Sequence, residues 1–410
     1  MSGRGRDGAQ RESAHGAGWG GECARGWGVR WYGERVSEWP GVSVLMPVRN
    51  EEPYLADAVS HVLGQDYPGA IEVVIAVGPS RDRTEQIARD IAARDPRVTV
   101  VANPTGKIPA GLNLALGAAR YDVLARMDGH AMMPPGYLRT GVAVLGETGA
   151  ADVGGVMAAI GITPFQQAVA WAMTSKAGVG SAAWHTAGQA GPADSVYLGV
   201  YRREAITQAG GWDEGMLRAE DWELNYRIRA NGGLIWFTPD LRVTYRPRTN
   251  IRALASQYWH YGRWRHVVMR EHPETASFRY MAPPVAAGLV GLGLLSGLTG
   301  LVIPPAGNLP RAIWLIGGFA IPAIYLAGVT AVSAVLSRGV PASVRVRLPA
   351  VLAIMHMSWG AGFLTSPRRL HHAVRGETTV RSAKMGLWIL TYGDSSRNVA
   401  VRDTRSTAGT

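Results

Sequence analysis

Strands and helices alternate regularly between residues 42 and 127, and this alternation limits the chain to one class of fold. Short apolar runs at residues 42–47, 72–77, 98–102 and 123–127 have the composition of buried strands. Between them, residues 54–65, 83–94 and 109–119 carry apolar side chains at helical spacing. We therefore expect an α/β fold whose mostly parallel sheet is covered by helices on both faces.

The pattern is less regular in the next part of the chain. Residues 197–202 are predicted to form another strand, and residues 222–229 a helix that ends at Gly232 and Gly233. Residues 176–193 are rich in Gly, Ala and Ser, which predicts a mobile loop.

Two long apolar runs follow, at residues 281–303 and 312–337. Since about 20 apolar residues span a bilayer, both are predicted transmembrane helices; buried core helices are the alternative. A third run, residues 348–366, contains His356 and Trp359, so it either spans the membrane or lies at the interface; we favour a segment that does not cross. Arginines at residues 338–347 place that loop and the α/β part in the cytoplasm by the positive-inside rule.

These features divide the chain into four parts. Residues 1–38 are predicted to be a disordered leader without the apolar segment of a signal peptide, and residues 40–272 the α/β domain. Residues 273–366 form the membrane region, with two or three transmembrane helices, and residues 367–410 a basic tail. The net charge of +11 suits an anionic partner, but the first 280 residues lack a basic run with interleaved aromatics, which argues against nucleic acid.

Asp128 and His130 directly follow the strand predicted at residues 123–127. Ligands of open α/β sheets bind outside the carboxyl ends of the strands, so both side chains can point at one place there. Carboxylate oxygen and imidazole nitrogen both bind divalent ions, and such an ion helps a diphosphate to leave. The alternative is a turn aspartate beside a surface histidine.

Polar residues also follow the first and third strands. Pro47, Asn50 and Glu51 come at the end of the first strand, where polar groups can hold a nucleoside, although Asn-Glu is also an ordinary helix start. Lys107 lies in a Gly/Pro loop after the third strand and on the same edge as Asp128. It can neutralise a phosphate or be a solvated surface lysine.

Glu220 and Asp221 precede the helix at residues 222–229. One of them can act as a general base on an acceptor hydroxyl, or both can simply complement the helix dipole. Residues 257–266 are dense in aromatic and cationic side chains. This stretch is typical of an interfacial membrane anchor; alternatively, Arg263, Trp264 or Arg265 lines the acceptor or diphosphate site.

The order of these clusters resembles that of a known family. The stretch Pro47-Val48-Arg49-Asn50-Glu51 is followed by R-x-D-x-H at residues 126–130, GGWDE at 210–214 and E-D-x-E-L at 220–224. A Tyr-Arg-Pro-Arg stretch follows at 245–248. This series resembles family 2 glycosyltransferases of the GT-A fold, and more narrowly the succinoglycan-type exopolysaccharide transferases, which also carry C-terminal membrane segments.

The resemblance implies a role for each matching residue. Asp221 would be the catalytic base, with Glu220 beside it, and Asp128 and His130 would hold Mg²⁺ or Mn²⁺ on the diphosphate. The remaining residues implied to bind the nucleotide-diphospho-sugar are Pro47, Asn50, Glu51, Gly78, Lys107 and Arg126. Gly78 stands where family members commonly carry an aspartate that reads the base, which leaves the nucleotide undetermined, and Asp82 is a partial substitute.

The resemblance implies an inverting glycosyltransferase at the cell membrane, multi-pass, with its catalytic domain on the cytoplasmic side. It would move a hexose from a nucleotide-diphospho-sugar to a lipid-linked or glycan acceptor in cell-surface polysaccharide or glycolipid synthesis. The Q-x-x-R-W motif of processive synthases is too widely spaced here, at Gln257 and Arg263-Trp264, which favours single addition. A processive polysaccharide synthase, a nucleotidyltransferase and a catalytically silent membrane scaffold remain the alternatives.

Overall fold

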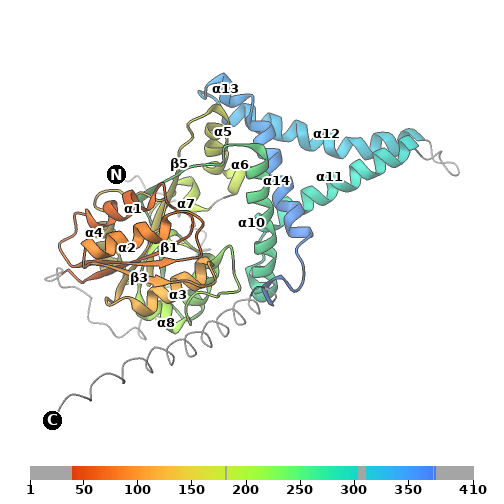
Figure 1. The fold of residues 1–410 in the computed structure, drawn as a ribbon. Coiled ribbons are helices and arrows are strands. Elements are labelled where there is room, and N and C mark those ends of the chain that lie inside the picture. The colour runs from red at the N-terminus through yellow and green to blue at the C-terminus, as the bar shows by residue number, and fades with distance from the viewer. Residues whose placement is uncertain (1–38, 181, 303–310, 373, 375–410) are drawn as a thin grey trace, which may run out of the picture.

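The computed structural model describes residues 39–180, 182–302, 311–372 and 374. The predicted leader, residues 1–38, and most of the predicted basic tail lie outside the described residues. The α/β part and a group of long C-terminal helices lie side by side in Figure 1.

The described residues form an eight-stranded sheet in the order β3-β2-β1-β4-β7-β5-β8-β6. Strands β1 to β4 pair in parallel, β7 is antiparallel to both β4 and β5, and β8 is parallel to β5. The strands are β1 (Val42–Val48), β2 (Ile71–Val77), β3 (Val98–Ala102), β4 (Val123–Arg126), β5 (Asp152–Ala159), β6 (Gly191–Pro192), β7 (Tyr197–Arg202) and β8 (Ile235–Tyr245).

Helices cover both faces of this sheet because side chains alternate along each strand. Val44 and Met46 of β1 enter one core, under α1 (Leu55–Leu63), α2 (Thr84–Arg94) and α4 (Tyr137–Thr148). Leu45, between them, enters the other core, under α3 (Ile108–Ala118), α8 (Arg203–Gln208) and α9 (Glu220–Ala230). The predicted α/β fold, with a mostly parallel sheet between two helical layers, is confirmed.

The elements from β1 to β4 begin and end within two residues of their predicted bounds. Strands β5 and β8 had no predicted counterpart. The sequence predicted a mobile loop at residues 176–193, but the structure has three short elements in this stretch: α6 (Lys176–Val179), α7 (Ala183–Thr186) and strand β6. Helix α5 (Pro164–Met173) precedes it and begins with a capping box between Thr163 and Gln166.

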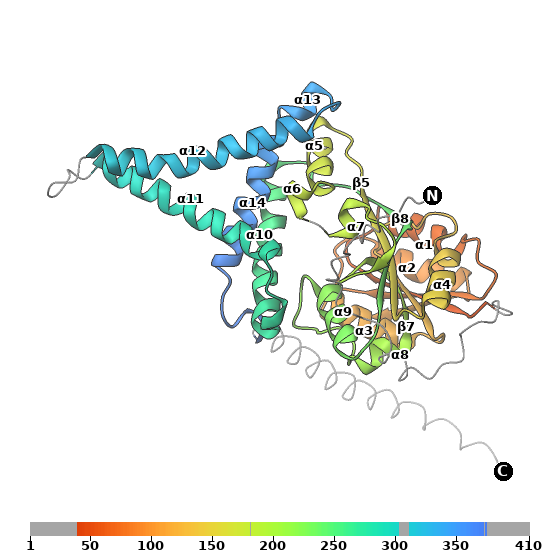
Figure 2. The same ribbon diagram turned by 180° about the vertical axis from the view of Figure 1, so that it is seen from behind.

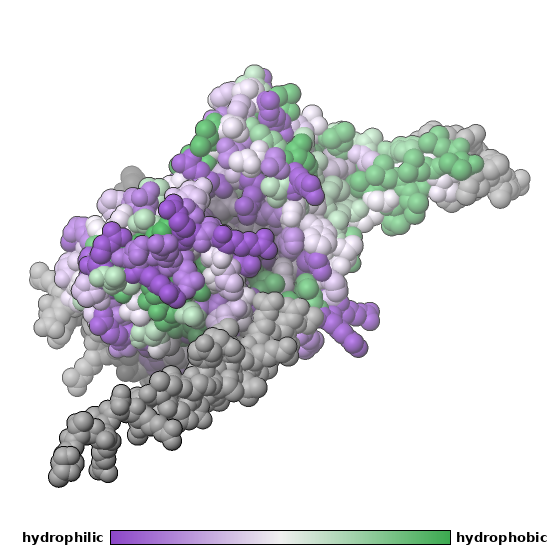
Figure 3. Space-filling view, in the orientation of Figure 1, coloured by the Kyte–Doolittle hydropathy of each residue, from purple (hydrophilic) through white to green (hydrophobic). Residues whose placement is uncertain are grey.

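Two C-terminal helices form a long hairpin that projects from the rest of the molecule (Figures 1 and 2). They are α11 (Phe278–Val302) and α12 (Arg311–Leu336). The space-filling view shows this hairpin as the most apolar part of the surface (Figure 3). By length and composition, Phe278–Val302 and Gly317–Leu336 can each cross a membrane, and both are mostly exposed.

The remaining C-terminal helices join the hairpin to the α/β part. They are α10 (Ile251–Glu271), the short η2 (Pro273–Thr275), α13 (Ala342–Arg345) and α14 (Leu348–Leu364). Glycines let α10 and α14 pack in backbone contact: a Cβ on Gly262 would lie 1.9 Å from the Trp359 carbonyl oxygen, and one on Gly362 would lie 2.0 Å from that of Trp259. Helix α14, the third apolar run, therefore lies along α10 rather than alone.

Candidate active site

Arg126, the last residue of β4, is the centre of a buried ion cluster. Its guanidinium lies 3.2 Å from Asp128 and 3.2 Å from Glu220, and it also forms an ion pair with Asp221. Arg126 is only 5% exposed. The structure thus joins the end of β4 to the start of α9, and it brings together acids that are some ninety positions apart in the sequence.

The charges in this cluster shift one another's protonation. Burial alone would lower the pKa of Arg126, but the negative charges of Asp221, Asp128 and Glu220 raise it well above its ordinary value. Burial raises the pKa of Glu220, and the neighbouring Asp221 adds to this effect while Arg126 opposes it. Arg126 therefore remains a cation, and Glu220 holds a proton more readily than an exposed glutamate does.

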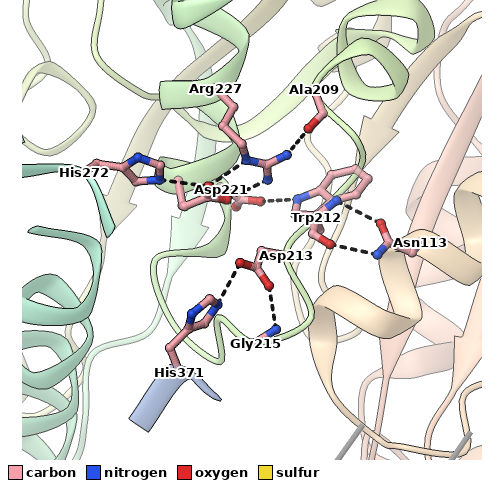
Figure 4. A network of polar contacts seen from close by, with 10 residues as sticks. Asn113, Ala209, Trp212, Asp213, Gly215, Asp221, Arg227, His272 and His371 are labelled. Carbon is pink, nitrogen blue, oxygen red and sulfur yellow. Dashed lines mark hydrogen bonds and ion pairs between the residues drawn. The ribbon is translucent and has the colours of Figure 1, made fainter. Parts of the chain in front are cut away.

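Asp221 is held from a second side by a tryptophan that sequence reasoning did not single out. The indole nitrogen of Trp212 donates a hydrogen bond to Asp221 Oδ1 at 3.1 Å (Figure 4). Asn113 fixes Trp212 in turn: its amide donates to the Trp212 carbonyl oxygen at 2.8 Å and accepts from the Trp212 backbone N–H at 2.9 Å. Since Trp212 belongs to the GGWDE stretch, that stretch was the available signal.

The backbone before the acids is unusual. Ala219 has φ of 62°, which non-glycine residues adopt rarely. This left-handed residue turns the chain directly into the first turn of α9, where Glu220 and Asp221 stand. Their charges also face the positive end of the helix dipole. Glu220 and Asp221 therefore complement the dipole of α9, which was the alternative to a catalytic role in the sequence analysis.

His130 pairs with Glu51 rather than standing alone. The His130 Nδ1 atom lies 2.8 Å from Glu51 Oε1, and this hydrogen bond, against the opposing effect of burial, raises the pKa of His130. Glu51, predicted to contact the nucleoside, thus orients the imidazole. Its ring keeps Nε2 for another partner.

The donor set fits a divalent cation that also binds phosphate oxygens. Asp128 would supply a carboxylate oxygen and His130 its Nε2 atom, and an acid partner on Nδ1 is common for histidine metal ligands. Within the described parts of the chain, no three His, Cys, Asp or Glu side chains gather as a metal site. Such a cation would therefore take further ligands from its substrate.

The polar residues after β1 and β2 are tied to each other. The Asn50 backbone N–H donates to Ser80 Oγ at 3.1 Å, and Asn50 Oδ1 accepts from the Arg81 backbone at 2.8 Å. Asp82 accepts from Thr84 and from the Glu52 backbone N–H, which uses both of its carboxylate oxygens. These bonds hold the Asp82 carboxylate in the loop after β2, and its role as a partial substitute for a base-reading aspartate stays a prediction.

Three further predicted residues have different surroundings. Pro47 is buried inside β1, and Gly78 allows close approach, because a Cβ there would lie 2.9 Å from Gly106 Cα. The Lys107 ammonium donates to the backbone carbonyl oxygen of Val374 at 2.7 Å. The C-terminal segment thus reaches the loop that carries Lys107, which nothing in the sequence indicated.

The aromatic and cationic stretch at residues 257–266 lies within α10. Trp264 is buried, and the Arg265 guanidinium contacts the rings of Trp222 and Tyr280, at 4.1 and 3.9 Å from their centres. Burial lowers the pKa of Arg265 to about 10. These two side chains therefore face the protein interior beside α9 and do not act as an interfacial anchor.

Comparison with known proteins agrees with this geometry. Residues 43–210 match the family model of Glycosyl transferase family 2. The chain is 31% identical to the succinoglycan biosynthesis protein ExoA of Rhizobium meliloti over 327 residues, which cover 78% of this chain and 93% of that protein. The chain belongs to glycosyl transferase family 2. It is a glycosyltransferase with an α/β sheet of the GT-A type, as predicted.

Two other similarities are more distant. The glycosyltransferase is 21% identical to a Methanococcus voltae protein over 239 residues, covering 56% of this chain and 74% of the other. That protein is named a dolichyl N-acetyl-α-D-glucosaminyl phosphate 3-β-D-2,3-diacetamido-2,3-dideoxy-β-D-glucuronosyltransferase. A solved mannosyltransferase from Pyrobaculum calidifontis, in complex with GDP-Man and Mn²⁺, is 21% identical with a TM-score of 0.49; the match covers 80% of this chain and 90% of that one.

Proposed function

We propose that this glycosyltransferase is membrane-attached and inverting. It moves a hexose from a nucleotide-diphospho-sugar to a lipid-linked or glycan acceptor in cell-surface polysaccharide or glycolipid synthesis. The observation that carries the proposal is the ion cluster of Arg126, which joins Asp128 to Asp221. A residue suited to the leaving diphosphate and a residue suited to the incoming hydroxyl therefore lie on either side of one guanidinium.

Asp221 is the general base in this proposal. It takes the proton of the acceptor hydroxyl while the hydroxyl oxygen bonds to the anomeric carbon and the bond to the diphosphate breaks, so the configuration inverts. Trp212 and Arg126 hold the Asp221 carboxylate from two sides, which keeps it oriented for this transfer. Glu220 lies beside it and shares the charge of Arg126.

In this proposal Asp128 and His130 would hold the cation, Mg²⁺ or Mn²⁺. When bound, a divalent cation neutralises charge on the departing nucleoside diphosphate. Glu51 keeps the His130 ring oriented, and Arg126 adds a fixed positive charge nearby. Asn50, Gly78, Pro47 and Lys107 belong to the donor side at the ends of the parallel strands.

The membrane assignment rests on the apolar hairpin and the flanking charges. Helices α11 and α12 would insert into the cell membrane, and the arginines of residues 338–347 would keep the catalytic domain, residues 40–272, on the cytoplasmic side. Helix α14, at 17 residues and packed along α10, would not cross. The region 273–366 thus attaches the enzyme and places its site near lipid-linked acceptors.

Sugar transfer by membranes that contain the full-length enzyme tests this proposal. Membranes are incubated with labelled nucleotide sugars, Mn²⁺ or Mg²⁺, and endogenous lipid acceptors. We expect transfer of one hexose to a lipid-extractable product by wild type, and loss of transfer with Asp128→Ala or with a chelator. Long products would instead favour a processive synthase, transfer of nucleoside monophosphate a nucleotidyltransferase, and no transfer from any donor a silent scaffold.

A further inference from the structure

The segment after α14 returns to the α/β part and contacts the proposed site. Its first residues bind α10: Ser366 Oγ donates to the Arg263 carbonyl oxygen at 3.0 Å, and Arg270 donates to the Pro367 carbonyl oxygen at 2.9 Å. From there Leu370 and His371 reach the loop that joins α8 to α9. We call residues 366–372 together with Val374 the C-terminal strap.

His371 makes the central contact of the strap. Its Nε2 atom lies 2.8 Å from Asp213 Oδ2, and its Nδ1 atom lies 3.3 Å from Glu271 Oε1 on α10. His371 is only 5% exposed. The imidazole thus connects α10 to the loop at residues 211–219, as Figure 4 shows for the Asp213 side.

Asp213 is one residue from the tryptophan that holds the base. Its Oδ1 accepts the Gly215 backbone N–H at 2.9 Å, so the same carboxylate that binds His371 also closes the turn. Trp212 donates to Asp221 on the other side of this turn. A short path therefore runs from His371 through Asp213 and Trp212 to Asp221 (Figure 4).

The strap is anchored by apolar and polar contacts on both sides of His371. Val374 packs in a buried cluster with Met216 and Trp222, against which Leu370 also packs. The Val374 carbonyl oxygen accepts the hydrogen bond of Lys107. The strap therefore touches the loop before the base and also the predicted donor side.

From these contacts we infer that His371 is a positioning residue of the transferase, which acts through Asp213 and Trp212 to hold Asp221 in its reactive orientation. This inference rests on the proposed function, in which Asp221 is the base. It makes His371 of the C-terminal strap a part of the active site, although α14 and the apolar hairpin separate this residue from the α/β part in the sequence.

The test compares substitutions at His371 in the full-length enzyme. His371→Leu keeps the bulk of the side chain and removes both nitrogens, His371→Gln keeps a donor for Asp213, and His372→Leu changes the exposed neighbour as a matched control. We expect His371→Leu to lower kcat by about tenfold or more with the KM of the donor nearly unchanged, because orientation of the base is lost and donor binding is kept. His371→Gln should recover most of kcat, and His372→Leu should behave as wild type.

Hydrogen exchange of the loop at residues 211–219 gives a readout that needs no sugar transfer. His371→Leu should speed exchange in this loop and leave β1 to β4 unchanged, even if wild type transfers no hexose and the proposed function fails. Unchanged exchange with unchanged kcat would overturn the inference. The inference would also be overturned if the Leu and Gln variants lost folding in general and did not show a lower kcat at unchanged KM. His371 would then only stabilise the fold.

Discussion

Removing the charge of Arg126 should destabilise the enzyme far more than removing an ordinary surface charge. Arg126 is buried and pairs with three carboxyl groups, so Arg126→Met would leave Asp128, Glu220 and Asp221 close together without their cation. Breaking a buried ion pair from one side costs about 3–5 kcal/mol. For a domain of this size about 2–4 °C of melting temperature is lost per kcal/mol, which gives a fall of about 6–20 °C.

Thermal unfolding of the purified enzyme in detergent measures this fall. Arg89→Met is the matched control, because Arg89 pairs with Glu85 on the surface of α2, where both side chains are more than half exposed. The control should melt as wild type does. Adding Glu220→Gln to Arg126→Met should recover part of the loss, since one negative charge of the cluster is gone. A melting temperature of Arg126→Met equal to that of Arg89→Met would refute the buried cluster.

Three further changes give distinct expectations. Burial raises the pKa of Asp152 well above its usual value, so folding takes up a proton. The stability of wild type should therefore fall as pH rises above the unfolded pKa of about 3.9. Asp152→Asn should remove this fall, so the melting temperature of the variant relative to that of wild type should increase from pH 5 to pH 8. Trp212→Phe keeps the ring but loses the donor to Asp221, and steady-state kinetics should show kcat about tenfold lower with little change in the KM of the donor. Gly262→Leu should lower stability by about 1–3 kcal/mol in thermal unfolding, because its side chain would collide with the Trp359 backbone.

The first half of the fold could be predicted because its strands are short, apolar and bounded by helices of clear periodicity. Strand β5 could not, since its Gly154-Gly155 pair gives no strand pattern; Gly155 is needed because a Cβ there would lie 1.8 Å from the Leu241 carbonyl oxygen of β8. This requirement for glycine comes from the packing of β5 against β8, so no local pattern in the sequence predicts it.

The acidic residues of the candidate site could be predicted from the sequence, but the residues that they contact could not. Asp128 and Asp221 stand at the ends of predicted elements, so their positions followed from the strand and helix patterns. Their joint contact with Arg126, the pairing of His130 with Glu51, and the reach of the strap to Lys107 join distant parts of the chain. Such contacts depend on how the elements pack, which spacing along one chain does not specify.

The most direct test of the proposed mechanism is the rate of hexose transfer by Asp221→Asn, measured beside the affinity of the same variant for the nucleotide-sugar donor. Asparagine has nearly the shape of aspartate but cannot take the proton of the acceptor hydroxyl. The account predicts that donor affinity stays close to that of wild type while transfer falls by about 10²–10⁴-fold. Transfer within a few-fold of wild type would contradict it, because the carboxylate held by Arg126 and Trp212 would then not be the base.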